Sequence, residues 1–463
     1  MSAVLLIDFG STYTKLTAVD VETERLLGTA SAYTTVTTDI NEGLEAARRR
    51  LEEEIGHRHF DACYACSSAA GGLRMVTSGL VPELTGEAAR LASLGAGAKV
   101  VGVYAFELTE DDLEEIAAAQ PDIFLLVGGT DGGNTACILH NAQMLSRLRP
   151  AFPIVVAGNR TAARQCQRLL AGWEVYLCPN VMPKFGVLHI EPTQKQIREI
   201  FLSRIIQAKG LSRAQSLLSD ILMPTPSAVL QAVELLAQGC EGEEGIGELV
   251  AVDVGGATTD VYSVADGMPQ EMNTVYKGLP EPYAKRTVEG DIGMRYSVQG
   301  IVEAAGLSRV GALSGLTPQR VEQLTAQLRQ YPDCVPAGDG ELEQLDFALA
   351  SCAVEEAVRR HAGTISETYT MMGRTFVQEG KNLTGVRQIV VTGGSLIHTG
   401  RTAEIAARAL YDPAHPESLR PKTAEIWVDQ KYILAAMGLL ASRYPQTALR
   451  IMKKELRHHG YSE

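Results

Sequence analysis

The sequence has no basic segment of the kind that binds nucleic acid. Among 463 residues, 42 are lysine or arginine and 55 are aspartate or glutamate, which gives a formal net charge of -13. A nucleic-acid-binding surface needs clustered cations to displace counterions from the phosphates. The short basic runs at 48–50 and 453–454 fit solvated helix faces instead. We therefore expect no nucleic-acid partner.

The sequence also lacks a long apolar segment. No apolar stretch reaches the roughly 18 residues that a membrane-spanning helix needs. The opening MSAVLLIDFG has no basic region, and its apolar run ends at Asp8, so we do not expect a signal peptide. We expect no membrane association and a cytoplasmic location.

Cysteines are few and scattered along the chain. The eight cysteines include one CxxC pair, Cys63 and Cys66, and no second pair of this spacing. This usage is typical of a reduced cytosolic protein. We favour the interpretation that these two are small buried residues at a strand end, with a redox pair or an iron–sulfur ligand pair as the alternatives.

What the sequence does contain is a regular succession of strands and helices. We expect strands at 3–8, 13–19 and 25–32, a charged helix at 40–55, and a strand leading into Cys66. From residue 98, apolar strands alternate with helices at steps of roughly 25 residues, which predicts a doubly wound parallel sheet. Thr109 with Asp112 predicts a capping box. We expect four regions: 1–97, an α/β domain at 98–190, a helical connection and linker at 191–247, and 248–463.

A glycine-rich loop follows one strand of the α/β domain. The segment GGTDGGN, at 128–134, comes directly after the apolar run DIFLLV. Ligands bind at the carboxyl ends of strands in such folds. A tight crossover turn is the alternative, and we favour it.

One element occurs twice. LLIDFGSTYTK (5–15) and VAVDVGGATTD (250–260) both read as a strand, an acid, a glycine-bearing turn, hydroxyl residues and a second strand. Backbone N–H groups at glycine and hydroxyl positions cradle phosphate oxygens. The candidate phosphate-binding residues are Gly10, Ser11, Thr12, Thr14, Lys15, Gly255, Gly256, Thr258 and Thr259. For Lys15, a side chain that only faces solvent is the alternative.

Each copy of this element also carries an acid at the strand end. Asp8 and Asp253 suit Mg²⁺, which keeps much of its water shell and also binds phosphates. Asp260 can orient an attacking water molecule. A third element, Gly393, Gly394 and Ser395, removes side-chain bulk where an adenosine can lie against the backbone. The order of the three elements predicts a nucleotide site with catalytic Asp8, Asp253 and Asp260.

These three stretches resemble the two phosphate motifs and the adenosine motif of the ATPase superfamily of actin, the 70-kDa heat-shock proteins and sugar kinases. The resemblance implies an α/β fold with two ribonuclease-H-like actin-type lobes, at 1–97 and 248–463, that bind Mg²⁺ and ATP between them. The doubly wound domain would be inserted between the two phosphate motifs. Related ATPases have a glycine-bearing loop after the second phosphate hairpin, which offers Gly293 as a further nucleotide contact.

A narrower resemblance covers nearly the whole chain. It is carried by CSSAAGGL, GLVPELT, LGAGAKVV, GGTDGGN, NVMP, ILMPTPSAVL, GLPEPYAKRTVEGDIGMRYS and VVTGGSL, together with the duplicated element. The chain resembles the MutL family of accessory proteins encoded with glutamate mutase, also called GlmL. This implies an ATP-dependent reactivating factor for an adenosylcobalamin-dependent mutase, such as glutamate mutase or an aminomutase, from which it releases damaged cobalamin. Contact with cobalamin would be indirect, since residues 98–180 contain no D-x-H-x-x-G sequence.

The residues by themselves leave other functions open. A small-molecule kinase on the same fold is the main alternative, and phosphorylated product would reveal it. An activator that passes electrons to a dehydratase would need Cys63 and Cys66 to hold an iron–sulfur cluster. A nucleotide-bound scaffold would bind ATP without turnover. Homo-oligomerisation also stays open.

Overall fold

The computed structural model describes residues 2–10, 13–33, 40–67, 73–208, 220–332, 334, 336, 338, 340–370 and 373–462. The chain divides into two compact units. The first consists of Met1–Ala228 with Gly278–Pro280, and the second of Val229–Lys277 with Glu281–Glu463.

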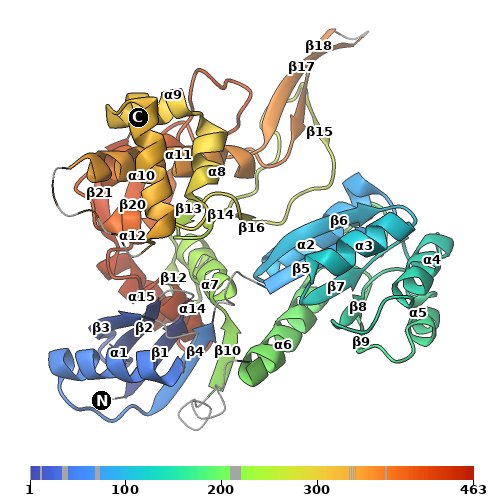
Figure 1. Cartoon of the computed structure of the whole chain (residues 1–463), viewed down its shortest axis with the longest axis horizontal. Coiled ribbons are helices and arrows are strands. Elements are labelled where there is room, and N and C mark those ends of the chain that lie inside the picture. Colours follow the sequence, from blue (N-terminus) through green and yellow to red (C-terminus); the bar gives the residue numbers. More distant parts are fainter. Residues whose placement is uncertain are drawn as a thin grey trace. The chain divides into compact units, whose positions relative to one another are not determined.

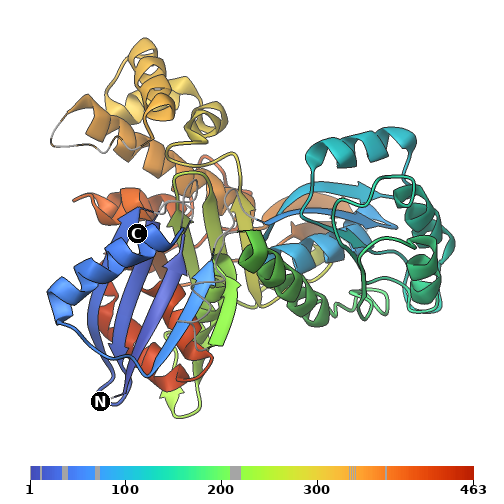
Figure 2. The same cartoon turned by 60° about the horizontal axis from the view of Figure 1, so that its bottom comes forward.

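The first unit begins with a five-stranded sheet in the order β10-β4-β1-β2-β3. The strands β1 to β3 form an antiparallel meander, and β4 and β10 continue the sheet in parallel. Helix α1 lies across the face of β2 and β3 (Figure 2), so the alternating apolar residues of these strands are buried beneath it. The elements are β1 (Ala3–Phe9), β2 (Tyr13–Asp20), β3 (Arg25–Tyr33), α1 (Ile40–Ile55), β4 (Ala62–Ser67) and β10 (Asp220–Pro224).

The same unit contains an inserted parallel sheet in the order β6-β5-β7-β8-β9. Strand β7 shows why both faces are covered: Ile123 and Leu125 enter one apolar core, and Phe124 and Leu126 enter the other. The strands are β5 (Leu73–Gly79), β6 (Ala98–Ala105), β7 (Ile123–Leu126), β8 (Ile154–Val156) and β9 (Val175–Leu177). The helical elements are η1 (Pro82–Gly86), α2 (Glu87–Gly95), α3 (Glu110–Ala119), α4 (Ala136–Leu145), α5 (Ala163–Leu169) and α6 (Glu191–Ala208).

Two boundaries in this unit differ from those that the sequence suggested. Strand β5 pairs with β6 and β7, so the inserted sheet includes residues 73–79 and starts before residue 98. Strand β10 pairs with β4, so the stretch 191–247 is more than a helical connection and returns the chain to the first sheet. Each of these strands pairs with a strand that is distant in the sequence. Local patterns therefore did not show which sheet it joins. The capping box of α3 is present as predicted.

The second unit has a six-stranded sheet in the order β16-β14-β13-β19-β20-β21. The long helix α11 packs against β13 and β14 and lies in the main apolar core of this unit. The strands are β13 (Leu249–Val254), β14 (Thr259–Val264), β16 (Ala284–Glu289), β19 (Gln388–Thr392), β20 (Ala424–Val428) and β21 (Arg457–Ser462). The helical elements are α7 (Thr225–Gln238), which begins in the first unit, α8 (Val298–Ala305), α9 (Leu307–Ser314), α10 (Pro318–Gln330), α11 (Glu341–His361), α12 (Gly394–Ile397), α13 (Thr402–Ala406), η3 (Ala407–Ala409), α14 (Leu434–Ala441) and α15 (Pro445–Glu455).

Apart from the added edge strand β21, this sheet repeats the first sheet of the other unit. In each, three antiparallel strands are followed by two parallel ones, and the first strand of the meander lies in the centre. Strands β1, β2, β3, β4 and β10 thus correspond to β13, β14, β16, β19 and β20. This is the ribonuclease-H-like order, and the predicted fold of two such lobes with an inserted doubly wound domain is confirmed.

Two small sheets complete the second unit. The sheet β15-β18-β17 stands away from the helices of its own unit (Figure 1). It consists of β15 (Thr274–Lys277), β17 (Thr364–Thr370) and β18 (Gly373–Glu379), and a short hairpin consists of β11 (Gly239–Cys240) and β12 (Glu243–Glu244). In the part of the chain that the structure describes, no helix is both long and apolar enough to cross a membrane.

Candidate functional site

The first candidate phosphate turn joins β1 to β2. Asp8 pairs with Lys15 and Phe9 with Thr14 across the hairpin. The Gly10 N–H donates to the Tyr13 carbonyl at 3.1 Å. Thr14 is buried within the sheet. The candidates Ser11 and Thr12 lie outside the described residues.

Asp8 is almost completely buried and is surrounded by donors. Its Oδ1 accepts a 2.6 Å hydrogen bond from Thr225 Oγ1 and a 3.4 Å hydrogen bond from Cys66 Sγ. Lys15 Nζ lies 3.8 Å from Asp8 Oδ2. Burial, reinforced by the nearby Asp8 carboxylate, raises the pKa of the Cys66 thiol, so Cys66 stays protonated and donates. Lys15 therefore faces the candidate metal-binding acid rather than solvent alone.

The CxxC pair is explained by this arrangement. Both cysteines are buried on β4, and their spacing of three places them on opposite faces of the strand. Cys66 lies beside β1 in register with Asp8. Neither a disulfide nor a shared metal ion fits two side chains on opposite faces, so the favoured interpretation as buried strand residues agrees with the structure.

The second candidate turn joins β13 to β14 and has the same geometry. Asp253 pairs with Asp260 and Val254 with Thr259. The Gly255 N–H donates to the Thr258 carbonyl at 2.9 Å. Each hairpin thus pairs its strand-end acid with the residue seven positions later, and each closes its turn with a glycine N–H to the carbonyl three positions later.

Asp260 has a partner that the sequence did not suggest. Arg286 on β16 donates from Nε to Asp260 Oδ1 at 2.7 Å, and its guanidinium is almost fully buried. Thr258 Oγ1 lies 3.4 Å from the other carboxylate oxygen. Thr259 is buried, as Thr14 is in the first hairpin. The role of Asp260 in orienting water stays a prediction.

The loop after β16 folds back onto the second turn. The Met294 N–H donates to the Gly255 carbonyl at 3.0 Å, and the Arg295 N–H donates to the Gly256 carbonyl at 2.8 Å. A side chain at Gly293 would place its Cβ 2.3 Å from the Ala257 carbonyl carbon, so only glycine fits this approach. The loop that contains Gly293 therefore supports the second turn directly.

The candidate adenosine loop lies beside the same turn. Gly393 has φ of +112°, and a Cβ there would come within 2.3 Å of the Val254 carbonyl oxygen. Gly394 and Ser395 begin α12 and are accessible to solvent. A Cβ at Gly394 would lie 3.2 Å from Tyr432 Oη. The loop thus runs along the end of β13, with Gly393 buried and Gly394 and Ser395 accessible.

Sequence reasoning missed the polar residues that follow the parallel strands β20 and β10. Asp429 follows β20, and its carboxylate accepts from the N–H groups of Ile433 and Leu434 at 2.9 and 3.1 Å. Thr392 Oγ1 lies 3.4 Å from Asp429 Oδ2. Thr225 follows β10, the counterpart of β20. The available signal was a polar residue placed directly between an apolar strand and a helix.

The GGTDGGN loop is closed by side chains from the next two strand ends. Asn159 donates to the carbonyls of Gly133 and Asn134, both at 3.1 Å, and Asn180 donates to the Gly129 carbonyl at 3.0 Å. Asn180 also donates to Asp131 Oδ1 at 3.0 Å. Because these groups are already paired, the loop fits the favoured interpretation as a tight crossover turn.

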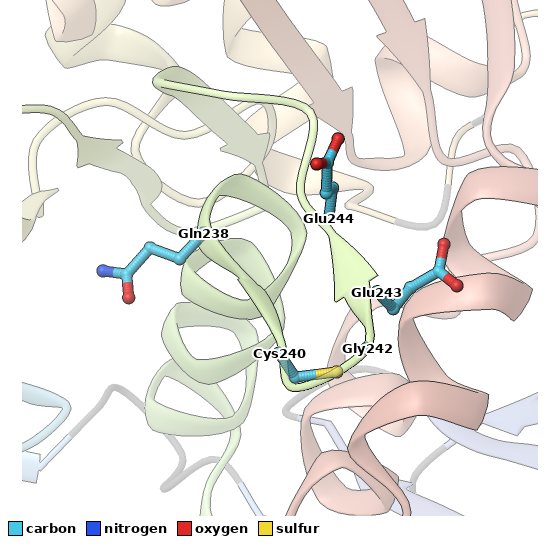
Figure 3. A pocket seen from close by; sticks show the side chains of 5 residues that line it. All are labelled: Gln238, Cys240, Gly242, Glu243 and Glu244. Atoms are coloured by element: carbon cyan, nitrogen blue, oxygen red, sulfur yellow. The ribbon is translucent and has the colours of Figure 1, made fainter.

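A shallow pocket lies beside the β11–β12 turn (Figure 3). Glu243 is ion-paired with Arg450 and Lys453 on α15, both at 2.9 Å. None of the candidate residues lies here. The lining residues are Gln238, Cys240, Gly242, Glu243 and Glu244.

The side chains that are present also limit the kind of metal site that this chain can form. Among the residues that the structure describes, no three histidine, cysteine or acidic side chains converge to form a metal cage. Mg²⁺ that is held mainly by phosphates and water needs only one or two carboxylates. Asp8 and Asp253 therefore stay candidates for holding such an ion.

Comparison with known proteins identifies the family of this chain. The sequence profile described as "MutL protein" matches residues 4–456. "Protein MutL" of Clostridium tetanomorphum is 47% identical over 460 residues, which cover 98% of this chain and 99% of that protein.

A structure of diol dehydratase-reactivating factor in nucleotide-free form aligns with 96% of this chain and 100% of its own, at 11% identity and a TM-score of 0.37. Component A of the (R)-2-hydroxyglutaryl-CoA dehydratase of Acidaminococcus fermentans covers 98% of this chain and 99% of its own, at 9% identity and a TM-score of 0.32. At such scores these two structures carry no argument. The sequence matches do, and they show that the chain belongs to the MutL protein family.

Proposed function

We propose that this chain is an ATPase that acts on a protein partner, an adenosylcobalamin-dependent mutase such as glutamate mutase or an aminomutase. The observation that carries the proposal is the repeated hairpin. Asp8 and Asp253 occupy the same position in two turns with the same register and the same glycine hydrogen bond. A duplicated acid-and-glycine turn supports two phosphate motifs.

The chemistry of the donors fits ATP with Mg²⁺. Bound Mg²⁺ would neutralise charge on the phosphates, with Asp8 and Asp253 holding its water shell. Gly256 would offer its backbone N–H to a phosphate oxygen. Gly10 and Gly255, whose N–H groups close their own turns, would let the phosphates approach without side-chain bulk. Gly393, Gly394 and Ser395 would form the floor under adenosine. Asp260, held by Arg286, would orient the attacking water.

The family resemblance supplies the partner. ATP binding and hydrolysis would drive a conformational cycle, and such cycles can do mechanical work on a bound protein. The work proposed here is the release of damaged cobalamin from a stalled mutase. An acidic chain with net charge -13 suits a protein partner better than a polyanion.

The test is the recovery of inactivated mutase. Several adenosylcobalamin-dependent mutases are inactivated and incubated with this protein, ATP, Mg²⁺ and fresh cobalamin. We expect recovery of at least one mutase only when all four are present. Recovery without ATP, or with none of the mutases, would reject the proposal. Phosphorylated product from added metabolites would support a kinase instead.

A further inference from the structure

Phe106 is held in an unusual conformation at the end of an edge strand. It directly follows β6, the outermost strand of the inserted sheet. Its φ is +66°, and 61% of the residue is exposed. A bulky side chain at positive φ crowds its own backbone, and an exposed ring gains no burial. Local structure alone gives no reason for this residue.

The other non-glycine residues with positive φ in the described part of the chain have simpler explanations. Glu24 lies in the turn between β2 and β3, and Gln120 is the C-cap of α3. Tyr432 lies in the turn that Asp429 caps and is half-buried. Among these residues, Phe106 alone combines a large apolar side chain with exposure above one half.

Side chains of α4 hold the Phe106 backbone. Its carbonyl accepts from Asn141 Nδ2 at 3.0 Å and from Cys137 Sγ at 3.2 Å. Asn141 Oδ1 accepts from the Leu108 N–H at 2.8 Å, and His140 Nε2 lies 3.0 Å from the Leu108 carbonyl oxygen. Asn141 is fully buried, and its amide pairs with the backbone of both Phe106 and Leu108. Backbone strain that neighbouring side chains maintain through hydrogen bonds is typical of functional positions.

The chain segment around Phe106 combines exposed apolar side chains with many acids. Val103, on the same edge strand, is 46% exposed. Residues 103–116 contain six acidic residues and no lysine or arginine. Of these, Glu107, Asp111 and Glu114 are exposed and make no ion pair with any residue that the structure describes. The segment therefore combines two exposed apolar side chains with three unpaired acids.

We propose that Phe106 is the anchor by which the inserted domain docks onto its protein partner, where it enters an apolar pocket rimmed by basic side chains. An aromatic anchor surrounded by polar groups is the usual composition of a binding hot spot. The unpaired acids of the same segment select a basic surface and speed encounter with it. This inference rests on the proposed function, which supplies the mutase as the partner.

The test measures binding of the mutase that the recovery assay identifies. Phe106→Asn keeps a residue that tolerates positive φ but removes the ring. We expect its affinity for the mutase to fall at least about tenfold, with no decrease in the thermal unfolding midpoint. Phe106→Trp keeps a large aromatic anchor and should bind within about threefold of the wild type.

Phe185→Ala is the matched control. Phe185 belongs to the same domain and is 76% exposed, but it follows β9, at the opposite end of the strand order. This variant should bind like the wild type. The anchor would be overturned by unchanged binding of Phe106→Asn, by equal losses in the two variants, or by a lowered unfolding midpoint of Phe106→Asn. None of these results would bear on the recovery assay that tests the proposed function. Absence of wild-type binding to any mutase would overturn both proposals.

Discussion

Thr225 Oγ1 donates a 2.6 Å hydrogen bond to Asp8 Oδ1, which joins two residues 217 positions apart. Thr225 is the first residue of α7, and Asp8 is close to the end of β1. The bond fixes one oxygen of the candidate metal-binding carboxylate. Because Cys66 Sγ approaches the same oxygen, the orientation of Asp8 depends on β4 and on the start of α7, which the chain reaches later.

Replacing Thr225 by valine should therefore impair catalysis without unfolding the lobe. Valine keeps the shape of threonine and removes the donor. Loss of a group that orients a metal-binding residue typically costs about 10- to 100-fold in activity or metal affinity. We expect a loss of this size in ATP hydrolysis, and a higher Mg²⁺ concentration for half-maximal rate. Thr225→Ser restores the hydroxyl and should stay close to wild type, whereas a Val variant with unchanged Mg²⁺ dependence would rule out the positioning role.

A branched side chain at Gly394 should block nucleotide binding. A Cβ there already lies 3.2 Å from Tyr432 Oη, and the two further methyl groups of valine would cover the accessible part of the loop. We expect ATP affinity to fall at least about tenfold, measured by titration calorimetry. Gly400→Val is the control, because a Cβ at Gly400 meets nothing within 4 Å. Equal affinity in the two variants would show that adenosine lies elsewhere.

Local sequence signals predicted the hairpins well. The strands of the first hairpin, α1 at Ile40–Ile55 and the capping box at Thr109 all lie where the pattern placed them. These features depend on neighbours along the chain. The equal registers of the two hairpins also followed from the repeated spacing of acid and glycine.

Contacts between distant residues were not predictable in this way. The partner of Asp260 is Arg286, on the next strand of the meander, and that of Asp8 is Thr225. Strand β5 was not predicted, and its residues were placed with the first lobe, because local patterns do not say which sheet a segment joins. Nothing in the sequence pattern distinguished Phe106 from an ordinary strand-end residue, since its conformation is set by α4.

Lys381 should make stability depend on pH. It is 1% exposed and donates to the carbonyls of Tyr283 and Pro282 at 2.6 and 2.9 Å. Burial lowers its pKa to about 7. The unfolded chain keeps this proton up to about pH 10.4, so between the two values the unfolded state binds more protons and stability rises with pH.

The measurement is urea unfolding of wild type and Lys381→Met from pH 6 to 10. We expect the wild type to gain stability relative to the variant above pH 7, with a slope of up to about 1.4 kcal/mol per pH unit. Lys277→Met removes an exposed lysine that is paired with Glu379, and its curve should run parallel to the wild type. Parallel curves for Lys381→Met as well would show that this amine is charged in both states.

Asn159 should be important for the stability of the inserted domain. It is fully buried, and besides its bonds to the GGTDGGN loop it accepts from the Thr161 N–H at 3.0 Å. Alanine would remove at least three hydrogen bonds to partly buried backbone groups, each worth about 0.5–1.5 kcal/mol. We expect the free energy of unfolding to fall by about 2–4 kcal/mol in denaturant titrations.

Arg160→Ala provides the comparison for Asn159→Ala. The Arg160 side chain is 79% exposed and lies 3.8 Å from Asp131. Its loss should cost less than about 1 kcal/mol, as is usual for a surface ion pair. Similar losses in both variants would mean that Asn159 does not hold the loop as described.

Release of damaged cobalamin from the mutase tests the central claim most directly. Inactivated mutase is incubated with this protein, Mg²⁺ and ATP, and the absorbance of cobalamin is followed in the low-mass fraction after gel filtration. The account predicts release with the wild type and ATP, and none with Asp8→Ala, with Asp253→Ala, or without nucleotide. Release that is independent of ATP, or release by either aspartate variant equal to that by the wild type, would contradict it.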